Sequence, residues 1–138
     1  MDDLAGAGSR LKSRIQTAIR ALGTLREVIG REEPQPLERD AAIQRFEYTF
    51  EATWKAAMHF LHEVEGLEVA SPKGVVRACR EVGLLTSEEA REALTLADDR
   101  NLTVHTYNEA LAKAIYSRLE AHARLMDVWL ERMDRRLP

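Results

Sequence analysis

Apolar residues recur along three long stretches of the chain at helical steps, mostly of three and four residues, which line one face of an α-helix. In chain order, the three stripes consist of Leu4, Leu11, Ile15, Ala18, Leu22, Leu25 and Ile29; of Ile43, Phe46, Phe50, Trp54, Ala57, Leu61 and Val64; and of Leu111, Ile115, Leu119, His122, Met126, Trp129 and Met133. The pattern predicts long amphipathic helices over residues 4–29, over residues 38–65 and after residue 108.

Glycines and capping residues mark the predicted helix ends. The residues that directly follow helical patterns are Gly30, Gly66 and Gly83. Ser71 before Pro72 predicts a helix start, because a serine hydroxyl caps the first turn and proline fits within it. Thr86 with Glu89 predicts another start, as a capping box in which each side chain bonds to the backbone amide of the other residue. Two short helices, from residue 72 to about 81 and from residue 87 to about 99, therefore join the long ones.

The sequence shows no strand pattern beside the helical one. No stretch shows the alternation of apolar and polar residues that a half-buried strand requires. With 138 residues, the chain is long enough for one domain with a substantial core but short for two. The expected fold is all-α: a single domain over residues 1–138, built as an antiparallel up-and-down bundle of about five helices.

Composition narrows the function classes. A net charge of −3 argues against broad, nonspecific nucleic-acid binding, although a local basic patch remains possible. A single cysteine, Cys79, excludes an internal disulfide framework and fits a reducing cytoplasm. It lies on an apolar helix face with Val75 and Val82, and we expect a small core residue there. No cleavable leader and no bilayer-length apolar run is evident, so we expect a cytoplasmic protein without membrane contact.

Two histidines raise the question of a metal. His59 and His62 lie one helical turn apart on the second long helix, so two imidazoles could share an ion. A metal site needs a third or fourth ligand, and no further histidine or cysteine falls in register nearby. We therefore expect surface histidines, no metal and no cofactor.

Charged residues on two helices admit two interpretations. Lys73, Arg77 and Arg80 form a basic stripe on the third helix, which is either a solvated face or a surface that contacts phosphates or an acidic partner. Glu47 and Glu51 are four residues apart on the second helix. They matter for binding only if they face a pocket.

Polar and titratable residues crowd into the stretch LADDRNLTVHTYNEA, residues 96–110. On one continuous helix Arg100 and His105 would point about 140° apart. If the helix ends near Asn101, which tolerates the left-handed conformation, the following loop folds His105 back toward Arg100. That pocket would join a permanent cation to an imidazole that titrates near neutrality, a set suited to phosphodiester chemistry. The alternative is a structural Arg–Asp pair and a histidine cap. The last helix then starts at Asn108, or at Thr106 with Glu109.

The residues RNLTVHTY, 100–107, resemble the R-N-x-x-x-H-x-Y signature of the HEPN superfamily. The similarity is greatest to the small nucleotidyltransferase substrate binding protein family, which includes the HepT toxins. The segments RFEYTFEATWKAAMHFL, residues 45–61, and SPKGVVRACREVGLL, residues 71–85, resemble the helix-two and helix-three motifs of that family. Asn108 stands where an aspartate is common, and the fourth helix lacks a frequent tryptophan, which alters the expected packing of the pocket.

The resemblance implies a homodimeric HEPN bundle whose two motifs meet at the interface and act as a metal-independent ribonuclease. In that assignment His105 is the acid and base, Arg100 holds phosphate, and Asn101 orients the substrate. Lys73, Arg77, Arg80, Glu47 and Glu51 are weaker candidates for substrate binding. A minimal nucleotidyltransferase encoded nearby is the expected antitoxin, and RNA the expected substrate.

Two points stay open after the resemblance. In the HepT branch the tyrosine that matches Tyr107 receives AMP from the partner nucleotidyltransferase, which blocks the ribonuclease; the alternative for Tyr107 is a buried side chain that braces the loop. The whole chain also has two other possible roles. It could be a non-catalytic subunit that binds substrate or nucleotide for a two-component nucleotidyltransferase, or a purely structural dimerisation module.

Overall fold

The computed structural model of the chain describes the backbone of residues 2–138 and the side chains of residues 6 and 8–138. The elements are α1 (Asp2–Arg26), α2 (Pro36–Glu65), α3 (Pro72–Glu81), α4 (Ser87–Leu102), the 3₁₀ turn η1 (Thr103–His105) and α5 (Glu109–Arg135). Within the described residues there is no β-strand. The expected all-α class with three long and two shorter helices is confirmed.

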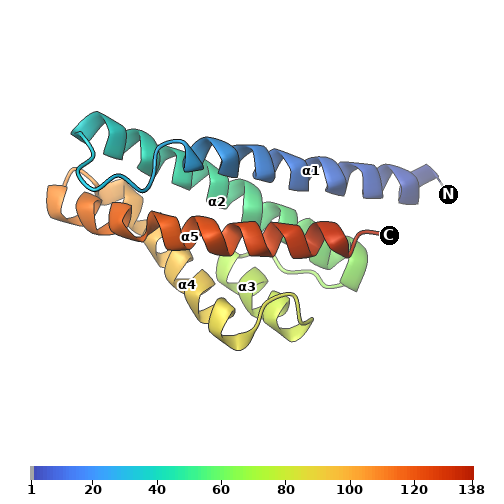
Figure 1. Cartoon of the computed structure of the whole chain (residues 1–138). Coiled ribbons are helices and arrows are strands. Elements are labelled where there is room, and N and C mark those ends of the chain that lie inside the picture. Colours follow the sequence, from blue (N-terminus) through green and yellow to red (C-terminus); the bar gives the residue numbers. More distant parts are fainter. Residues whose placement is uncertain (1) are drawn as a thin grey trace.

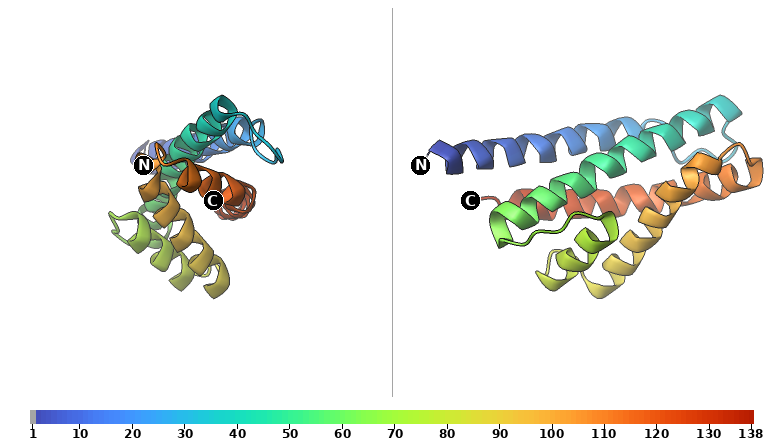
Figure 2. Two further views of the ribbon diagram at one scale, coloured as in Figure 1. Left: turned by 90° about the vertical axis from the view of Figure 1, so that its left-hand side faces the viewer. Right: turned by 180° about the vertical axis from the view of Figure 1, so that it is seen from behind.

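The long helices α1, α2 and α5 lie side by side, and α3 and α4 form a short hairpin against one side of them (Figure 1). The chain runs out along α1, back along α2, out again along α4 and back along α5. Both ends of the chain consequently lie at one end of the bundle (Figure 2). The α1–α2 connection and the α4–α5 junction therefore gather at the opposite end, where Arg100, Asn101, His105 and Tyr107 lie.

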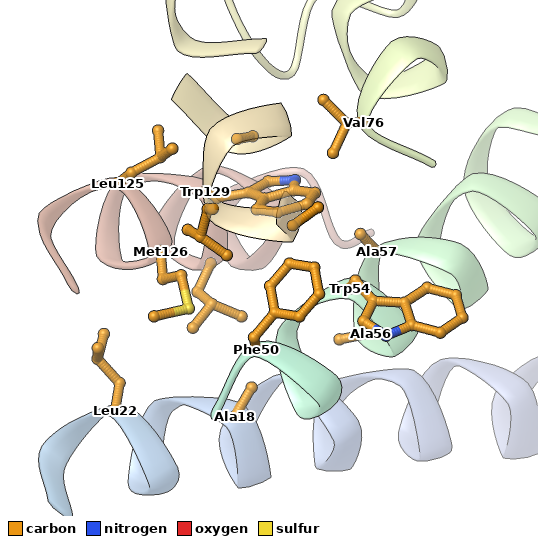
Figure 3. Close-up of a cluster of buried hydrophobic side chains, with 14 of the residues drawn as sticks. Ala18, Leu22, Phe50, Trp54, Ala56, Ala57, Val76, Leu125, Met126 and Trp129 are labelled. Atoms are coloured by element: carbon orange, nitrogen blue, oxygen red, sulfur yellow. The ribbon is translucent and has the colours of Figure 1, made fainter. Parts of the chain in front are cut away.

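The apolar stripes form the core. Figure 3 shows Phe50 of α2 and both Met126 and Trp129 of α5 pointing toward one another above Ala18 and Leu22 of α1. All five side chains are essentially inaccessible to solvent. The three stripes therefore supply much of the core, and residues of α3, α4 and their connection complete it, among them Val75, Val76, Leu84, Leu85 and Leu96.

Among the described members of the predicted stripes, three are not fully buried: Val64, Ile29 and, in the first turn of α5, Leu111. Val64, near the end of α2, is exposed, because the chain turns away at Gly66. Ile29 lies beyond α1, which ends at Arg26, and is half-buried in the connection. The side chain of Leu4 lies outside the described residues. Periodicity therefore predicted the faces of the helices well and their terminal turns poorly.

The predicted helix starts are confirmed. Ser71 Oγ accepts a hydrogen bond from Gly74 N at 3.1 Å at the start of α3. At the start of α4, Glu89 N donates to Thr86 Oγ1 at 3.1 Å and Thr86 N donates to Glu89 Oε1 at 2.8 Å, which completes the capping box. Asn108 Oδ1 accepts from the third amide of α5 at 3.1 Å. Of the two starts considered for α5, Asn108 is therefore the cap.

The described residues contain neither a cluster of metal ligands nor a membrane-spanning helix. Nowhere among them do three or more histidine, cysteine, aspartate or glutamate side chains gather closely enough to hold a metal ion. None of the helices in this part of the chain combines the length and the apolar character that crossing a membrane requires.

Candidate functional site

A cavity of about 440 Å³ lies between α2, the start of α3 and the end of α4. Its lining consists of Phe50, Glu51, Trp54, Ser71, Pro72, Lys73, Ala97, Arg100 and Asn101. We call it the Arg100 cavity. It brings together four residues that the sequence marked as candidates on three different helices: Arg100, Asn101, Lys73 and Glu51.

Arg100 enters the cavity from α4 and is paired across it. Its Nη2 lies 2.7 Å from Glu51 Oε1, and its Nε is buried without a hydrogen-bond partner among the described residues. Glu51 is itself held, because Trp54 Nε1 donates to Glu51 Oε2 at 3.3 Å. The expected Arg–Asp pair is therefore wrong for Arg100, whose partner is a glutamate of α2. Glu51 fixes the guanidinium while leaving other N–H groups to a ligand.

Lys73 supplies a second cation to the same cavity. Its Nζ lies 2.6 Å from Asp98 Oδ1, a carboxylate one turn before the end of α4. Both side chains are about half exposed, so solvent screens this pair and an anionic ligand competes with it at small cost. Together Lys73 and Arg100 make the cavity a place where a phosphate group finds two cations.

The end of α4 differs from the expected one. Asn101 remains helical, and no residue other than glycine has a positive φ among the described residues, so the predicted left-handed end at Asn101 is wrong. The chain tightens into η1 instead, because both the backbone N–H and the hydroxyl of Thr103 bond to Arg100 O, the hydroxyl at 2.6 Å. This turn carries the backbone onward to His105.

His105 and Tyr107 form an exposed pair at the end of the bundle. Tyr107 Oη lies 3.4 Å from His105 Nδ1, and the two rings meet edge to face with centroids 5.9 Å apart. Tyr107 is 85% exposed, so the alternative of a buried, bracing tyrosine is wrong. Neither residue belongs to the lining of the Arg100 cavity. Within one chain, the imidazole of His105 therefore lies outside the cavity that Arg100 lines.

A buried network of charged and polar side chains, which the sequence patterns did not predict, lies beside residues 100–107. Asp99 is 3% exposed and accepts two hydrogen bonds from Arg118, at 2.8 and 2.7 Å, and one from His122 Nε2 at 2.7 Å. His122 also stacks on Phe46, with ring centroids 5.5 Å apart. The available signal was His122 itself: a histidine within an apolar stripe needs a polar partner, and Asp99 supplies it.

The pKa values of this network follow from burial and pairing. Burial alone would raise the pKa of Asp99, but the hydrogen bonds from Arg118 and His122 outweigh it and hold that pKa below its ordinary value. Burial lowers the pKa of His122, and the neighbouring Asp99 only partly offsets this effect. The network therefore favours an ionised aspartate beside a neutral imidazole that donates through Nε2.

The remaining candidates lie elsewhere. Arg80 Nε donates to Ser87 Oγ at 3.0 Å, and Arg77 is exposed. Glu47 is half-buried on α2 and does not line the Arg100 cavity. Only Lys73 of the basic stripe and only Glu51 of the two glutamates reach the site.

The histidine pair and the cysteine largely have the structural roles that were expected. His62 is exposed, as expected, whereas His59 is half-buried, and burial lowers its pKa. Cys79 is buried in the core as expected, and burial raises the pKa of its thiol to about 12.

Comparison with solved structures identifies relatives of the whole chain. A Thermus thermophilus protein of known crystal structure is 65% identical, over 84% of this chain and 98% of its own, with a TM-score of 0.83. A tri-AMPylated HEPN toxin from Shewanella oneidensis, solved in complex with its MNT antitoxin, is 16% identical over 91% of this chain and 96% of its own, with a TM-score of 0.75. At that identity the second likeness shows the fold alone.

A third relative comes from Haemophilus influenzae, and its structure is described as the fold of a substrate binding domain of a nucleotidyltransferase. It is 21% identical over 96% of this chain and 98% of its own, with a TM-score of 0.63. No curated protein matches the sequence. The family model described as "Nucleotidyltransferase substrate binding protein like" matches residues 13–135, nearly the whole chain. The chain therefore belongs to the nucleotidyltransferase substrate binding protein family.

Proposed function

We propose that this protein is a HepT-like toxin: a metal-independent endoribonuclease, neutralised by a minimal nucleotidyltransferase, whose site is shared between two copies of the chain. One observation carries the proposal. Arg100 and Asn101 line a cavity with Lys73, whereas His105 lies outside that cavity and is exposed in η1, directly after the same helix. A second copy that docks on this end of the bundle would present its own His105 to the Arg100 cavity.

The chemistry requires an acid, a base and a fixed cation. His105 of one copy takes the proton from a ribose 2′-hydroxyl, and the 2′-oxygen attacks the adjacent phosphorus. The bond from phosphorus to the 5′-oxygen of the next nucleotide breaks, and that oxygen receives a proton from the same imidazole, which acts first as base and then as acid. Arg100 stabilises the charge that develops on the phosphoryl oxygens, and Asn101 orients the substrate. The products are a 2′,3′-cyclic phosphate and a 5′-hydroxyl.

The test is RNA cleavage and growth inhibition by Arg100→Ala and His105→Ala. Each variant should lose both activities while keeping wild-type helicity and melting temperature. His105 is exposed, and the one ion pair that Arg100 makes among the described residues reaches the partly exposed Glu51. Lys73→Ala should weaken cleavage without abolishing it. An unfolded Arg100→Ala or His105→Ala variant would instead assign these residues a structural role.

A second candidate function is supported by the cavity alone. The indole of Trp54 and the cations of Lys73 and Arg100 are groups that could bind a nucleotide without catalysing any reaction. The chain could then bind substrate for a separate nucleotidyltransferase. Wild-type protein that never cleaves RNA, even without its partner, but binds nucleotide in an Arg100-dependent way would favour this function.

Tyr107 is the proposed point of control by the partner. Its 85% exposure leaves the phenol free to attack the α-phosphorus of ATP, with pyrophosphate leaving and the phenolic proton passing to a base. Each AMP adds bulk and negative charge beside His105, which would block RNA. Co-expression with the partner should give intact masses raised by one or more AMP units, and Tyr107→Phe should show none. Mass increments that persist in Tyr107→Phe would remove Tyr107 from this role.

A further inference from the structure

A second cavity, of about 640 Å³, lies where the α1–α2 connection meets the first turns of α5. We call it the Arg39 cavity. Three cations line it, Arg31, Arg39 and Lys113, together with Tyr116 and three carboxylates, Glu32, Glu33 and Glu120. It shares no lining residue with the Arg100 cavity. Tyr116 braces its wall, since the phenol donates to Val28 O and accepts from Arg31 N, both at 3.2 Å.

Arg39 is buried without adequate compensation for its charge. Its side chain is 9% exposed, and its Nε has no hydrogen-bond partner among the described residues. Its one ion pair with a described residue joins Nη2 to Glu109 Oε1 at 4.0 Å, which is too long for a hydrogen bond. Glu109 is 67% exposed, and the same Oε1 lies closer to Lys113 Nζ, at 3.3 Å.

A buried guanidinium that donates no hydrogen bond destabilises the protein that contains it. An apolar side chain of similar volume would fill the same space without this cost. The arginine is therefore poorly paired among the described residues, and an anion that enters the cavity would supply the acceptors that its guanidinium lacks. A carboxylate would only replace Glu109 with its equivalent. A phosphate carries more charge and more acceptor oxygens, so it can displace Glu109 from both cations.

We propose that Arg39 and Lys113 form a phosphate-binding site, separate from the Arg100 cavity, which holds the phosphate of a nucleotide or of an RNA strand. The guanidinium Nη groups donate hydrogen bonds to the phosphate oxygens, and Lys113 contacts the phosphate from α5. Glu109 occupies the two cations until the phosphate arrives. The site lies at the same end of the bundle as Tyr107, because Glu109 follows Tyr107 by two residues. It binds ligand whether or not the protein cleaves RNA.

The test measures binding of three probes to the full chain: inorganic phosphate, 5′-AMP and a short DNA oligonucleotide, which lacks the 2′-hydroxyl that cleavage requires. Arg39→Met should lower the affinity for the bound probe about tenfold or more and raise the melting temperature of the free protein. Glu109→Gln should raise the affinity, since it removes the competing carboxylate. Arg91→Met is the matched control, because Arg91 is exposed on α4 and lines neither cavity.

The probes also identify the source of the phosphate. Arg39-dependent binding of 5′-AMP but not of the oligonucleotide indicates a free nucleotide, and the reverse indicates a nucleic-acid backbone. Unchanged affinity for every probe in Arg39→Met overturns the site, and so does a fall in the melting temperature of the free variant. If Arg39→Met does not fold, Lys113→Gln and Glu109→Gln decide, with a lower and a higher affinity expected; no change in either overturns the proposal.

Discussion

Asp99 and Arg100 are adjacent in the sequence but belong to different parts of the molecule. Successive residues of a helix point about 100° apart, so one faces α5 and the other the Arg100 cavity. Asp99 is 3% exposed and bonded to Arg118 and His122, whereas Arg100 is half-buried beside Glu51. The first is therefore a stabilising residue and the second a candidate for binding.

This division predicts opposite behaviour for two neighbouring aspartates. Asp99→Asn should lower the free energy of unfolding by about 3 kcal/mol, because it leaves Arg118 and the buried His122 without their anion. Asp98→Asn removes a carboxylate that is 57% exposed and should cost less than about 1 kcal/mol. Urea unfolding measures both. Equal losses in the two variants would contradict the distinct role of Asp99.

Spacing along one helix predicted which residues could act, but not which of them meet. Arg100 and Asn101 stood out within their own segment, and both line the cavity. The sequence could not predict whether Lys73 and Glu51 belong to the site, because this depends on how α2 and α3 pack against the end of α4. The same reasoning failed for Arg100 and His105, since a loop that folds back and a 3₁₀ turn that continues are equally compatible with the sequence between them.

At the scale of elements, the capping signals were the most reliable and the end of α4 the least. Thr86, Ser71 and Asn108 act through local hydrogen bonds, which a short sequence determines. The end of α4 has no glycine or proline, so tertiary contacts of α4 with α5, including the bonds between Asp99 and Arg118, help to decide how far the helix runs. Those contacts lie nineteen residues apart in sequence and leave no local signal.

Two glycines with the same open surroundings should respond in opposite directions to alanine. Gly66 caps α2 at φ +69°, and a Cβ there would meet nothing within 4 Å. Gly66→Ala should therefore cost about 1 kcal/mol through the backbone alone. Gly23 lies within α1 and is also open, so Gly23→Ala should stabilise by about 0.5–1 kcal/mol. Chemical denaturation of both variants tests this, and a loss in Gly23→Ala would show that its surface is covered by something else.

At the scale of the whole molecule, acid should destabilise the fold in two steps. The pKa values of His122 and His59 lie below their ordinary 6.5 because of burial, and the hydrogen bond from Arg132 lowers the pKa of Glu89. The pKa of Asp99 is also lowered. In each case the unfolded chain takes up a proton at higher pH than the folded chain, so stability falls as pH falls. Protonation of the histidines lowers the stability first, below about pH 6.5. Protonation of the carboxylates lowers it further, at pH values below the ordinary pKa of a carboxyl group.

His122→Gln isolates the first step. Its amide still donates to Asp99 but does not titrate, so the loss of stability between pH 7.5 and 5.5 should be smaller than in the wild type, with the contribution of His59 remaining. Denaturant melts at several pH values measure it. An unchanged slope in the variant would show that His122 keeps the same pKa in both states.

The proposed site also depends on assembly. Light scattering at micromolar concentration should show a homodimer, and only a 15.7 kDa species across that range would exclude a shared site. The dimer alone, however, does not show that two chains complete one site, because two identical and independent sites would scatter in the same way. The placement of His105 outside the Arg100 cavity of its own chain makes a sharper experiment possible.

The two inactive variants should restore each other. In a mixed dimer, the His105→Ala chain contributes an intact Arg100, and the Arg100→Ala chain contributes an intact His105. If the guanidinium of one copy works with the imidazole of the other, each mixed dimer has one complete site. Half of the dimers in an equal mixture are mixed, so about a quarter of the wild-type ribonuclease activity should return after co-refolding. If the two groups act within one chain, no dimer in the mixture has a complete site and the activity stays at that of the separate variants.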